Sequence, residues 1–218
     1  MPPAVLIVAS TRVHADSQEI LRIQDTVSAL LEQGWSVDLL VPRTSPLLTS
    51  VLNPIVRVFT VPHVPFCANP PRRPSLRRFI TGMLQFFHGV ALASRRSYTV
   101  LHGVNDGALI VRAIDRMTVS RHPYIAEIHK PFSRPGFFKG PRAVFARALE
   151  RAALRHAAAI ILPDDATLAK FEGRLPKARV SLIPDPHAEL SPDAFTLGEF
   201  SEAIAHIYAY VLWPHLEK

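Results

Sequence analysis

The sequence predicts an α/β fold, with a doubly wound parallel sheet of about seven strands, helices on both faces and an additional C-terminal helix. Short apolar runs without alternation, typical of parallel strands buried on both faces, recur along the 218 residues. Segments with apolar residues at helical spacing separate these runs. Strands that alternate with helices favour a parallel sheet with right-handed crossovers. The composition, 48% hydrophobic and 20% charged, is that of a globular protein.

The first half of the chain reads as a strand over 4–9, a polar loop and a helix. Asp16 and Glu19 have the spacing of a capping box, and Gly34 is placed to end this helix. Strands are predicted over 37–41 and 56–61. After a Pro-rich stretch, Ser75 begins a predicted helix over 75–94. Its apolar side chains form one stripe, made of Leu76, Phe79, Ile80, Met83, Phe87 and Val90.

In the second half, strands are predicted over 98–101, 124–128, 158–162 and 180–183. Helices are expected around 109–117, from Pro141 onward, and briefly after Asp164 or Asp165, either of which can serve as a cap. The composition changes after Pro184. We therefore expect a sheet domain over 1–187, then a linker and a terminal helix over 188–218 that packs back on it. The apolar side of that helix is Phe200, Ile204, Ile207, Tyr208 and Val211.

Composition and missing motifs exclude several classes of protein. The single Cys67 excludes a disulfide framework and a thiolate zinc cluster. The chain has no dinucleotide fingerprint, P-loop, nucleophile elbow or Asp-x-Asp metal clamp, so no cofactor is predicted. The pairs His14/Asp16 and His187/Glu189 lack the spacing of helical metal ligands, so no metal site is expected. The missing basic leader and the lack of a run of roughly 20 apolar residues predict a cytoplasmic protein.

Polar residues follow several predicted strands, where ligands bind in open α/β sheets. Imidazoles, carboxylates and cations at one rim suit sugar hydroxyls and phosphate. Alternatively, Asp16, Asp106 and Asp164 only cap helices. His129 is the candidate catalytic residue, because it ends a strand at this rim, although a purely structural role is the alternative. The candidate substrate-binding residues are Arg12, His14, Asp16, His102, Asn105, Asp106 and Lys130.

Several segments resemble, in order and spacing, the N-terminal domain of GT-B glycosyltransferases of the family-four type. They are "AVLIVAS", "ILRIQDTVSALLEQGWSVDLLVP", "YTVLHGVNDGALIVRAI", "HPYIAEIHKPF", "FARALERAALRHAAAIILPDDATLAKF" and "RVSLIPDP", within about residues 4–187. The resemblance implies a Rossmann-like domain that binds the acceptor, facing a second domain that binds the nucleotide sugar. His129 stands where the family often has a histidine beside the reacting sugar. The loop "STRVHADS" departs from the family's usual Gly-Gly turn.

The resemblance implies the acceptor-binding domain of a glycosyltransferase, with a sugar or lipid-linked acceptor. The family's two glutamates eight positions apart are missing, so a nucleotide-sugar donor is expected only with a second domain. The chain alone is then expected to be inactive. The alternative is a non-catalytic binding or assembly module that pairs with a separate donor-domain chain. Nucleic-acid binding is disfavoured, because the sequence offers only its net charge of +7 and no recognition helix.

The stretch from 39 to 105 contains no Asp or Glu, and Arg72, Arg73, Arg77 and Arg78 lie at the start of its Phe-rich helix. Basic residues around an apolar stripe are typical of a helix at a membrane surface. The prediction is peripheral contact with an anionic membrane, at its inner face, through these four arginines. The alternative is a helix that faces the core with a solvated Arg rim.

Overall fold

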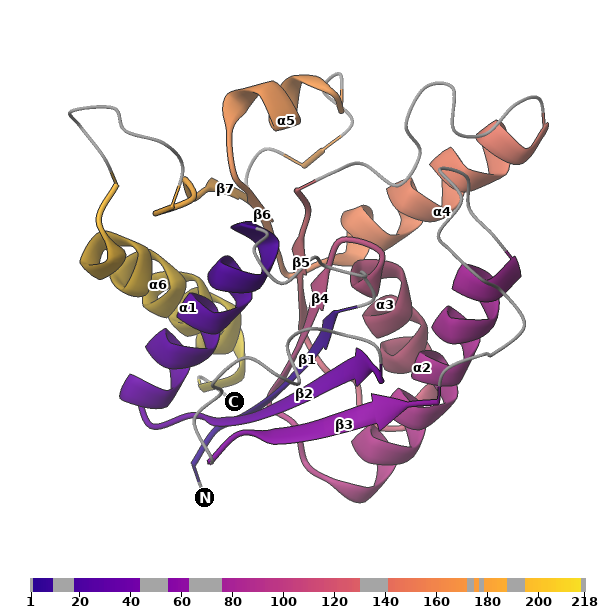
Figure 1. Ribbon diagram of the computed structural model, residues 1–218, viewed down its shortest axis with the longest axis horizontal. Helices are drawn as coiled ribbons and strands as arrows, with labels where there is room; N and C mark the ends of the chain where they lie inside the picture. The colour runs from indigo at the N-terminus through magenta and orange to yellow at the C-terminus, as the bar shows by residue number, and fades with distance from the viewer. Residues whose placement is uncertain are drawn as a thin grey trace.

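A computed structural model describes residues 2–9, 18–43, 55–62, 76–129, 141–171, 175–176, 179–187 and 195–216. Its centre is a seven-stranded, all-parallel sheet in the order β3-β2-β1-β4-β5-β6-β7 (Figure 1). This arrangement confirms the predicted fold class. The order reverses direction at β1 and β4, so the carboxyl ends of these strands flank a switch point, where open α/β sheets bind ligands.

The strands agree closely with the apolar runs of the sequence, and β1, β2, β4, β5 and β6 are buried along nearly their whole length. One boundary prediction was wrong: the fourth strand, predicted over 98–101, ends at Val104, three residues later than predicted. His102 and Gly103 are therefore strand residues rather than rim residues. The strands are β1 Ala4–Ala9, β2 Ser36–Pro42, β3 Arg57–Val61, β4 Val100–Val104, β5 Tyr124–Glu127, β6 Ala159–Leu162 and β7 Val180–Leu182.

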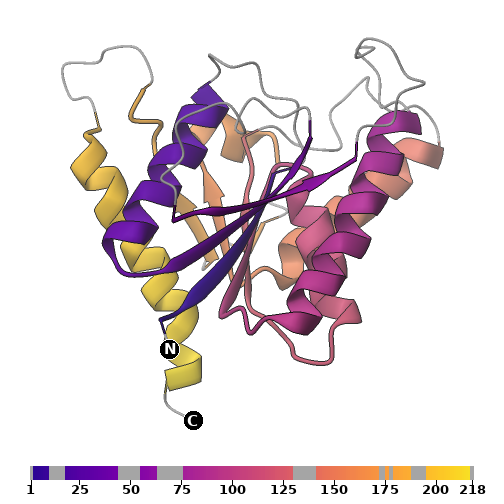
Figure 2. The same ribbon diagram turned by 60° about the horizontal axis from the view of Figure 1, so that its bottom comes forward.

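Helices cover both faces of the sheet (Figures 1 and 2). One apolar cluster joins the sheet to α1 and α6, and a second joins the opposite face mainly to α2, α3 and α4. The short helix α5 follows β6. The helices are α1 Gln18–Glu32, α2 Leu76–Arg95, α3 Gly107–Met117, α4 Pro141–His156, α5 Asp165–Ala169 and α6 Leu197–Leu216. None of those in the described part of the chain has the length and apolar character needed to cross a bilayer.

Two glycines allow α3 to begin directly against the sheet. A Cβ on Gly107, the first residue of α3, would lie 2.0 Å from the carbonyl oxygen of Val8. A Cβ on Gly103 would meet the backbone of Gly107 and Ala108 at 2.5 Å. Side chains at either position would push α3 away from β1 and β4. The polar residues after β4 are thereby held close to the end of β1.

The stripe predicted for α2 is not its buried side. Gln85, Gly89, Leu92 and Ala93 are buried instead, and the Gln85 amide donates to the carbonyl oxygen of Ala9. The side chains of Phe79, Met83 and Phe87 are exposed, the two phenylalanines by 66% and 61%. The residues of α2 in the apolar cluster on this sheet face are instead Leu92 and Ala93, with Leu84, Phe86 and Val90 partly buried against it.

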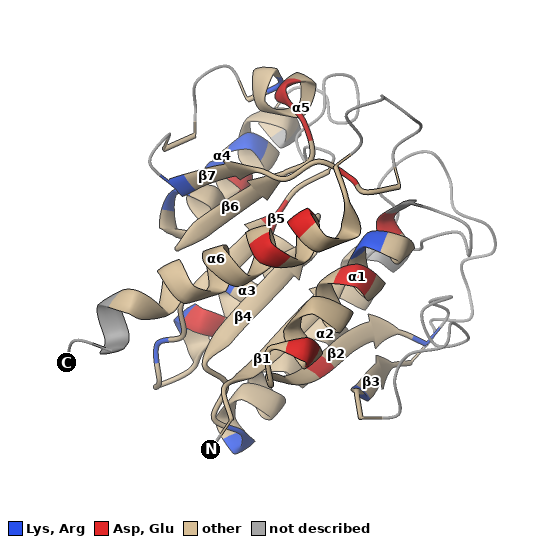
Figure 3. Cartoon of the chain, turned by 90° about the vertical axis from the view of Figure 1, so that its left-hand side faces the viewer, with Lys and Arg blue, Asp and Glu red and all other residues tan. Residues whose placement is uncertain are grey.

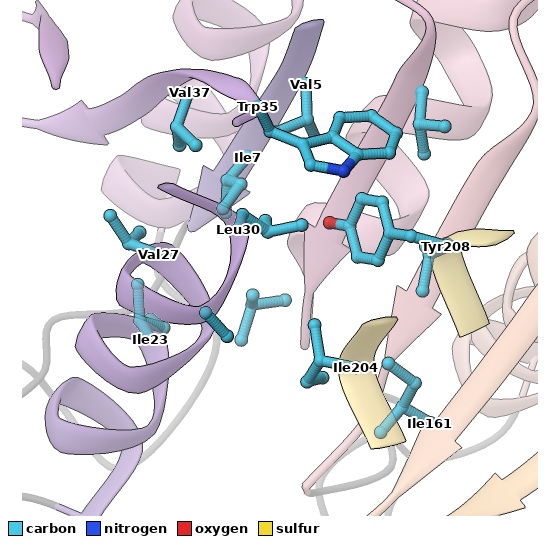
Figure 4. Packing of buried hydrophobic residues seen from close by; sticks show 14 of the residues in the cluster. Val5, Ile7, Ile23, Val27, Leu30, Trp35, Val37, Ile161, Ile204 and Tyr208 are labelled. Carbon is cyan, nitrogen blue, oxygen red and sulfur yellow. The ribbon is translucent and has the colours of Figure 1, made fainter. Parts of the chain in front are cut away.

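The C-terminal helix α6 lies beside α1 on the sheet, as Figure 3 shows. Its predicted apolar side is buried throughout, from Phe200 to Val211. The ring of Tyr208 packs edge-on against Trp35 with 5.0 Å between centroids (Figure 4). A residue near the end of the chain thereby becomes part of the same core as β1, β4 and β6.

Candidate functional site

The candidate site is built around Glu127, the last residue of β5, whose side chain is 1% exposed. Arg22 of α1, also 1% exposed, places its Nε 2.5 Å from Oε1 of Glu127. The Nε2 of His129 lies 2.9 Å from the same oxygen. A buried carboxylate is costly unless it is paired, and these two donors provide the pairing.

His102 approaches Glu127 from β4, on the other side of the carboxylate. Its Nε2 lies 3.1 Å from Oε2, an ion-pair distance whose angle departs from that of a regular hydrogen bond. Its Nδ1 lies 2.8 Å from the hydroxyl oxygen of Tyr208 on α6. His102 is fully buried within β4, which corrects the expectation that it lies at the rim, and its predicted contact with a substrate stays a prediction.

Backbone geometry fixes His129 just beyond the end of β5. Asn105 follows β4 with a φ of 52°, a conformation that asparagine adopts more readily than most residues. Its amide donates to the carbonyl oxygen of Glu127 at 2.7 Å, and its Oδ1 accepts from the amide of His129 at 2.9 Å. Asn105 therefore joins the ends of β4 and β5, and the His129 side chain remains 10% exposed.

Burial alone would raise the pKa of the Glu127 carboxyl, but the Arg22 charge and the two imidazoles outweigh it and hold this pKa well below its usual value. Burial, and then the charge of Glu127, raise the pKa of the Tyr208 hydroxyl well above its usual value. Glu127 is thus an ionised acceptor, and Tyr208 is a neutral donor.

These protonation states assign the tautomer that each imidazole adopts when it is neutral. Glu127 can only accept, so the Nε2 atoms of His102 and His129 carry the proton. Tyr208 then donates to Nδ1 of His102. In His129 the remaining nitrogen is Nδ1, which makes no hydrogen bond to any residue in the described part of the chain. The arrangement leaves a basic nitrogen beside the carboxyl edge of the sheet.

Arg22 and its helix also hold the segment that follows β7. The Nη1 of Arg22 donates to the carbonyl oxygen of Pro184 at 2.9 Å, and its guanidinium lies over the Phe200 ring. Three residues further along α1, Asp25 contacts Nε2 of His187 at 2.7 Å. Burial raises the pKa of the Asp25 carboxyl, although the hydrogen bond with His187 opposes that change.

The other predicted site residues are only partly within the described chain. Asp106 holds the N-cap position of α3 but makes no side-chain capping bond there. Asp164 caps α5 by accepting from the amide of Thr167, as predicted. The backbone of Arg77 and Arg78 lies in α2, and nothing is described of their side chains. Outside the described residues lie Arg12, His14, Asp16, Arg72, Arg73 and Lys130.

The sequence interpretation missed Arg22, Glu127 and Tyr208. Glu127 carried a signal, because a charged residue in an otherwise apolar strand buried on both faces requires a partner. Arg22 lies between Ile20 and Ile23 on the side of the helix expected to face the core, which is a similar signal. No sequence pattern could pair them, since they are 105 positions apart. Among the described residues, no group of three His, Cys, Asp or Glu could hold a metal ion.

Comparisons with known proteins agree with this architecture. Residues 21–186 match the family described as "Glycosyl transferase 4-like domain". No curated protein matches the chain. Sucrose-phosphate synthase from Thermosynechococcus elongatus superposes with a TM-score of 0.62 at 18% identity, over 84% of this chain and 48% of that one.

Two further solved structures share the fold. HepE of Anabaena, in complex with UDP, has a TM-score of 0.56 at 13% identity, over 85% of this chain and 44% of its own. UGT89C1 of Arabidopsis thaliana, complexed with UDP, has a TM-score of 0.57 at 14% identity, over 90% of this chain and 51% of its own. The chain thus spans about half the length of these structures.

Proposed function

The chain belongs to the glycosyl transferase 4-like domain family, and from this premise we propose that it forms the acceptor side of a glycosyl-transfer site centred on His129. The observation that carries the proposal is the assembly of His129, Glu127 and Arg22 at the carboxyl end of β5. Glu127 holds one imidazole nitrogen at 2.9 Å, and the other is left to accept a hydrogen bond or proton from a hydroxyl group.

The pairing of an imidazole with a buried carboxylate has two chemical effects. It fixes the tautomer and the ring orientation, and it stabilises the imidazolium that forms when the ring takes a proton. Arg22 limits the second effect, since it already neutralises much of the Glu127 charge. His129 is therefore suited to orienting an acceptor hydroxyl and to accepting its proton late in the reaction.

We propose that the residues that bind the donor diphosphate lie outside this chain. Two of the matched structures contain UDP, and this chain spans about half of each. Neutralising a diphosphate leaving group requires cations or helix N-termini aimed at it. The described cation nearest the candidate site, Arg22, is instead committed to Glu127 and Pro184. A nucleotide sugar is accordingly proposed as a substrate only when a second domain is present.

Two measurements on the 218-residue chain test the proposal. The chain should release no UDP from UDP-glucose above the enzyme-free rate. Measurable turnover would refute the proposal that donor binding requires a second domain. With n-octyl β-D-glucoside as the acceptor probe, NMR shift changes should centre on the His129 ring and be lost in His129→Ala. The matched control is His156→Ala, an exposed histidine of α4. Equal responses in both variants would contradict an acceptor site at His129.

We also propose that α2 and α4 bring this site to an anionic membrane surface. Both helices cover the same face of the sheet, and their N-terminal ends both lie toward its carboxyl edge (Figure 2). Each exposes large apolar side chains, which are Phe79, Met83 and Phe87 on α2 and Val144, Phe145 and Leu149 on α4. Arg147 and Arg151 of α4 are also exposed. Exposed apolar groups beside arginines suit a surface of anionic lipid.

Vesicle sedimentation tests this proposal. The chain should bind phosphatidylglycerol/phosphatidylcholine vesicles and not pure phosphatidylcholine. Binding should be lost when Arg72, Arg73, Arg77 and Arg78 are replaced by Ala, and weakened by Phe79→Ser. The control is the double variant Arg116→Ala/Arg121→Ala. Arg116 lies in the last turn of α3 and Arg121 follows that helix, and both are exposed. Binding that survives the first replacement, or that is equally reduced in the control, would refute a docking surface at this edge.

A further inference from the structure

A path of polar contacts leads from His129 inward to the C-terminal helix. From His129 they pass to Glu127 and then to His102, and from there to Tyr208 of α6. His102 and Tyr208 have no exposed surface, and Glu127 is 1% exposed. The three contacts that join these four side chains measure 2.9 Å for His129–Glu127, 3.1 Å for Glu127–His102 and 2.8 Å for His102–Tyr208. Among the described residues, Tyr208 is the hydrogen-bond partner of Nδ1 of His102.

We propose that Tyr208 is a positioning residue for His129, acting through His102 and Glu127, so that α6 is part of the site. The inference rests on the proposed function only in giving His129 its role. The Tyr208 hydroxyl donates to Nδ1 of His102 and so fixes the proton on Nε2, which faces Glu127. With Oε2 engaged there, the carboxylate presents Oε1 to His129 and Arg22.

The surroundings of Tyr208 favour a specific role for its hydroxyl rather than packing alone. Its ring is already held by Trp35 and the apolar cluster around α6 (Figure 4). A phenylalanine would make those same ring contacts. The hydroxyl is buried beside His102 and is affected by the charge of Glu127, and an oxygen without a hydrogen-bond partner would be costly there. The polar atom therefore has a use that the ring does not explain.

Loss of the Tyr208 hydroxyl should weaken the hydrogen bond of His129, because buried polar groups in contact polarise one another. Without a donor at Nδ1, the His102 ring loses its preference for one tautomer and one orientation. The Glu127 carboxylate then loses its fixed neighbour at Oε2 and is held only through Oε1. The hydrogen bond from Nε2 of His129 should open more often, although no atom of His129 has been changed.

Histidine-detected ¹⁵N NMR on the intact chain tests the inference. In the wild type, His102 and His129 should both be in the Nε2–H tautomer, with slowly exchanging Nε2 protons. In Tyr208→Phe, exchange of the His129 Nε2 proton should be about fivefold faster, which corresponds to about 1 kcal/mol. The matched control is Tyr210→Phe, which removes an exposed hydroxyl from the same helix and should change nothing.

A second pair of variants separates a polar role from a structural one. His102→Gln supplies both an acceptor for Tyr208 and a donor for Glu127, so it should keep His129 near its wild-type exchange rate. His102→Leu supplies neither and should accelerate exchange as Tyr208→Phe does. Equal exchange in the Gln and Leu variants, or an unchanged rate in Tyr208→Phe, would overturn the inference.

The wild type alone also decides the point, whether or not a variant folds. A wild-type His102 found in the Nδ1–H tautomer would overturn the inference without any mutation. These readouts require no glycosyl transfer. Acceptor binding that stays intact in His129→Ala would refute the proposed function, while the tautomers and exchange rates measured on the wild type and on the Tyr208 and His102 variants would still test this inference.

Discussion

Replacing Glu127 by Gln should cost about 3 kcal/mol of the free energy of unfolding, since it removes the anion from a buried ion pair. The guanidinium of Arg22 would stay 1% exposed, with Nε facing a neutral amide and Nη2 still without a hydrogen-bond partner. Removal of one partner of a buried pair typically costs about 3–5 kcal/mol. The lower end applies here, because the desolvation cost of the carboxylate disappears with it.

The effect can be measured by urea unfolding followed through the fluorescence of Trp35, which packs against Tyr208. Glu202→Gln, an exposed position on α6, is the control and should change stability by less than about 0.5 kcal/mol. Combining Glu127→Gln with Arg22→Met should cost less than the sum of the single changes by about 1 kcal/mol or more, since no buried cation remains. A loss below about 1 kcal/mol in Glu127→Gln would refute the reasoning.

The same pair predicts how stability depends on pH. The pKa of Glu127 is lower in the folded chain than in the unfolded one, so its contribution is complete above the ordinary glutamate pKa, about 4.3. The contribution is lost as the pH falls through the lower, folded pKa. Urea midpoints of the wild type should therefore fall more steeply in acid than those of Glu127→Gln. Parallel curves would show that folding does not lower the pKa of Glu127.

Two further predictions concern the scaffold. Gly107→Ala should destabilise the protein by more than about 3 kcal/mol or prevent folding, because the new Cβ would meet a backbone oxygen at 2.0 Å. Gly82→Ala in α2 is the control, since its Cβ would meet nothing within 4 Å, and it should stabilise the protein by about 0.5–1 kcal/mol. Thermal melting of both variants checks this, and equal melting temperatures would contradict it. Asp38→Asn should cost about 2–3 kcal/mol, since this buried carboxylate accepts from two arginines and Tyr98. Loss of one of those partners in Arg57→Ala, a side chain 53% exposed, should cost less than about 1 kcal/mol in the same urea assay.

The exposed side of α2 shows where periodicity alone misleads. Phe79, Met83 and Phe87 recur at helical spacing, which predicts a core-facing stripe. The helix instead buries Gln85 and Gly89. The glycine allows close approach to Ile114 of α3, and the Gln85 amide donates to carbonyl oxygens of β1 and β2. A periodic pattern identifies a helix and its apolar side, but the neighbouring helix decides which side is buried.

The amino-acid sequence by itself determined the elements and their order, since apolar runs, helical spacing, Gly34 and Asp164 act over a few residues. It also located His129 at the end of a strand, because a parallel sheet puts such residues at one edge. The tertiary structure alone decided the partners of His129. Arg22, Glu127, His102 and Tyr208 come from α1, β5, β4 and α6, and their pairing depends on how two helices lie across the sheet. Burial makes those contacts strong, and burial is a property of the assembled fold rather than of any segment.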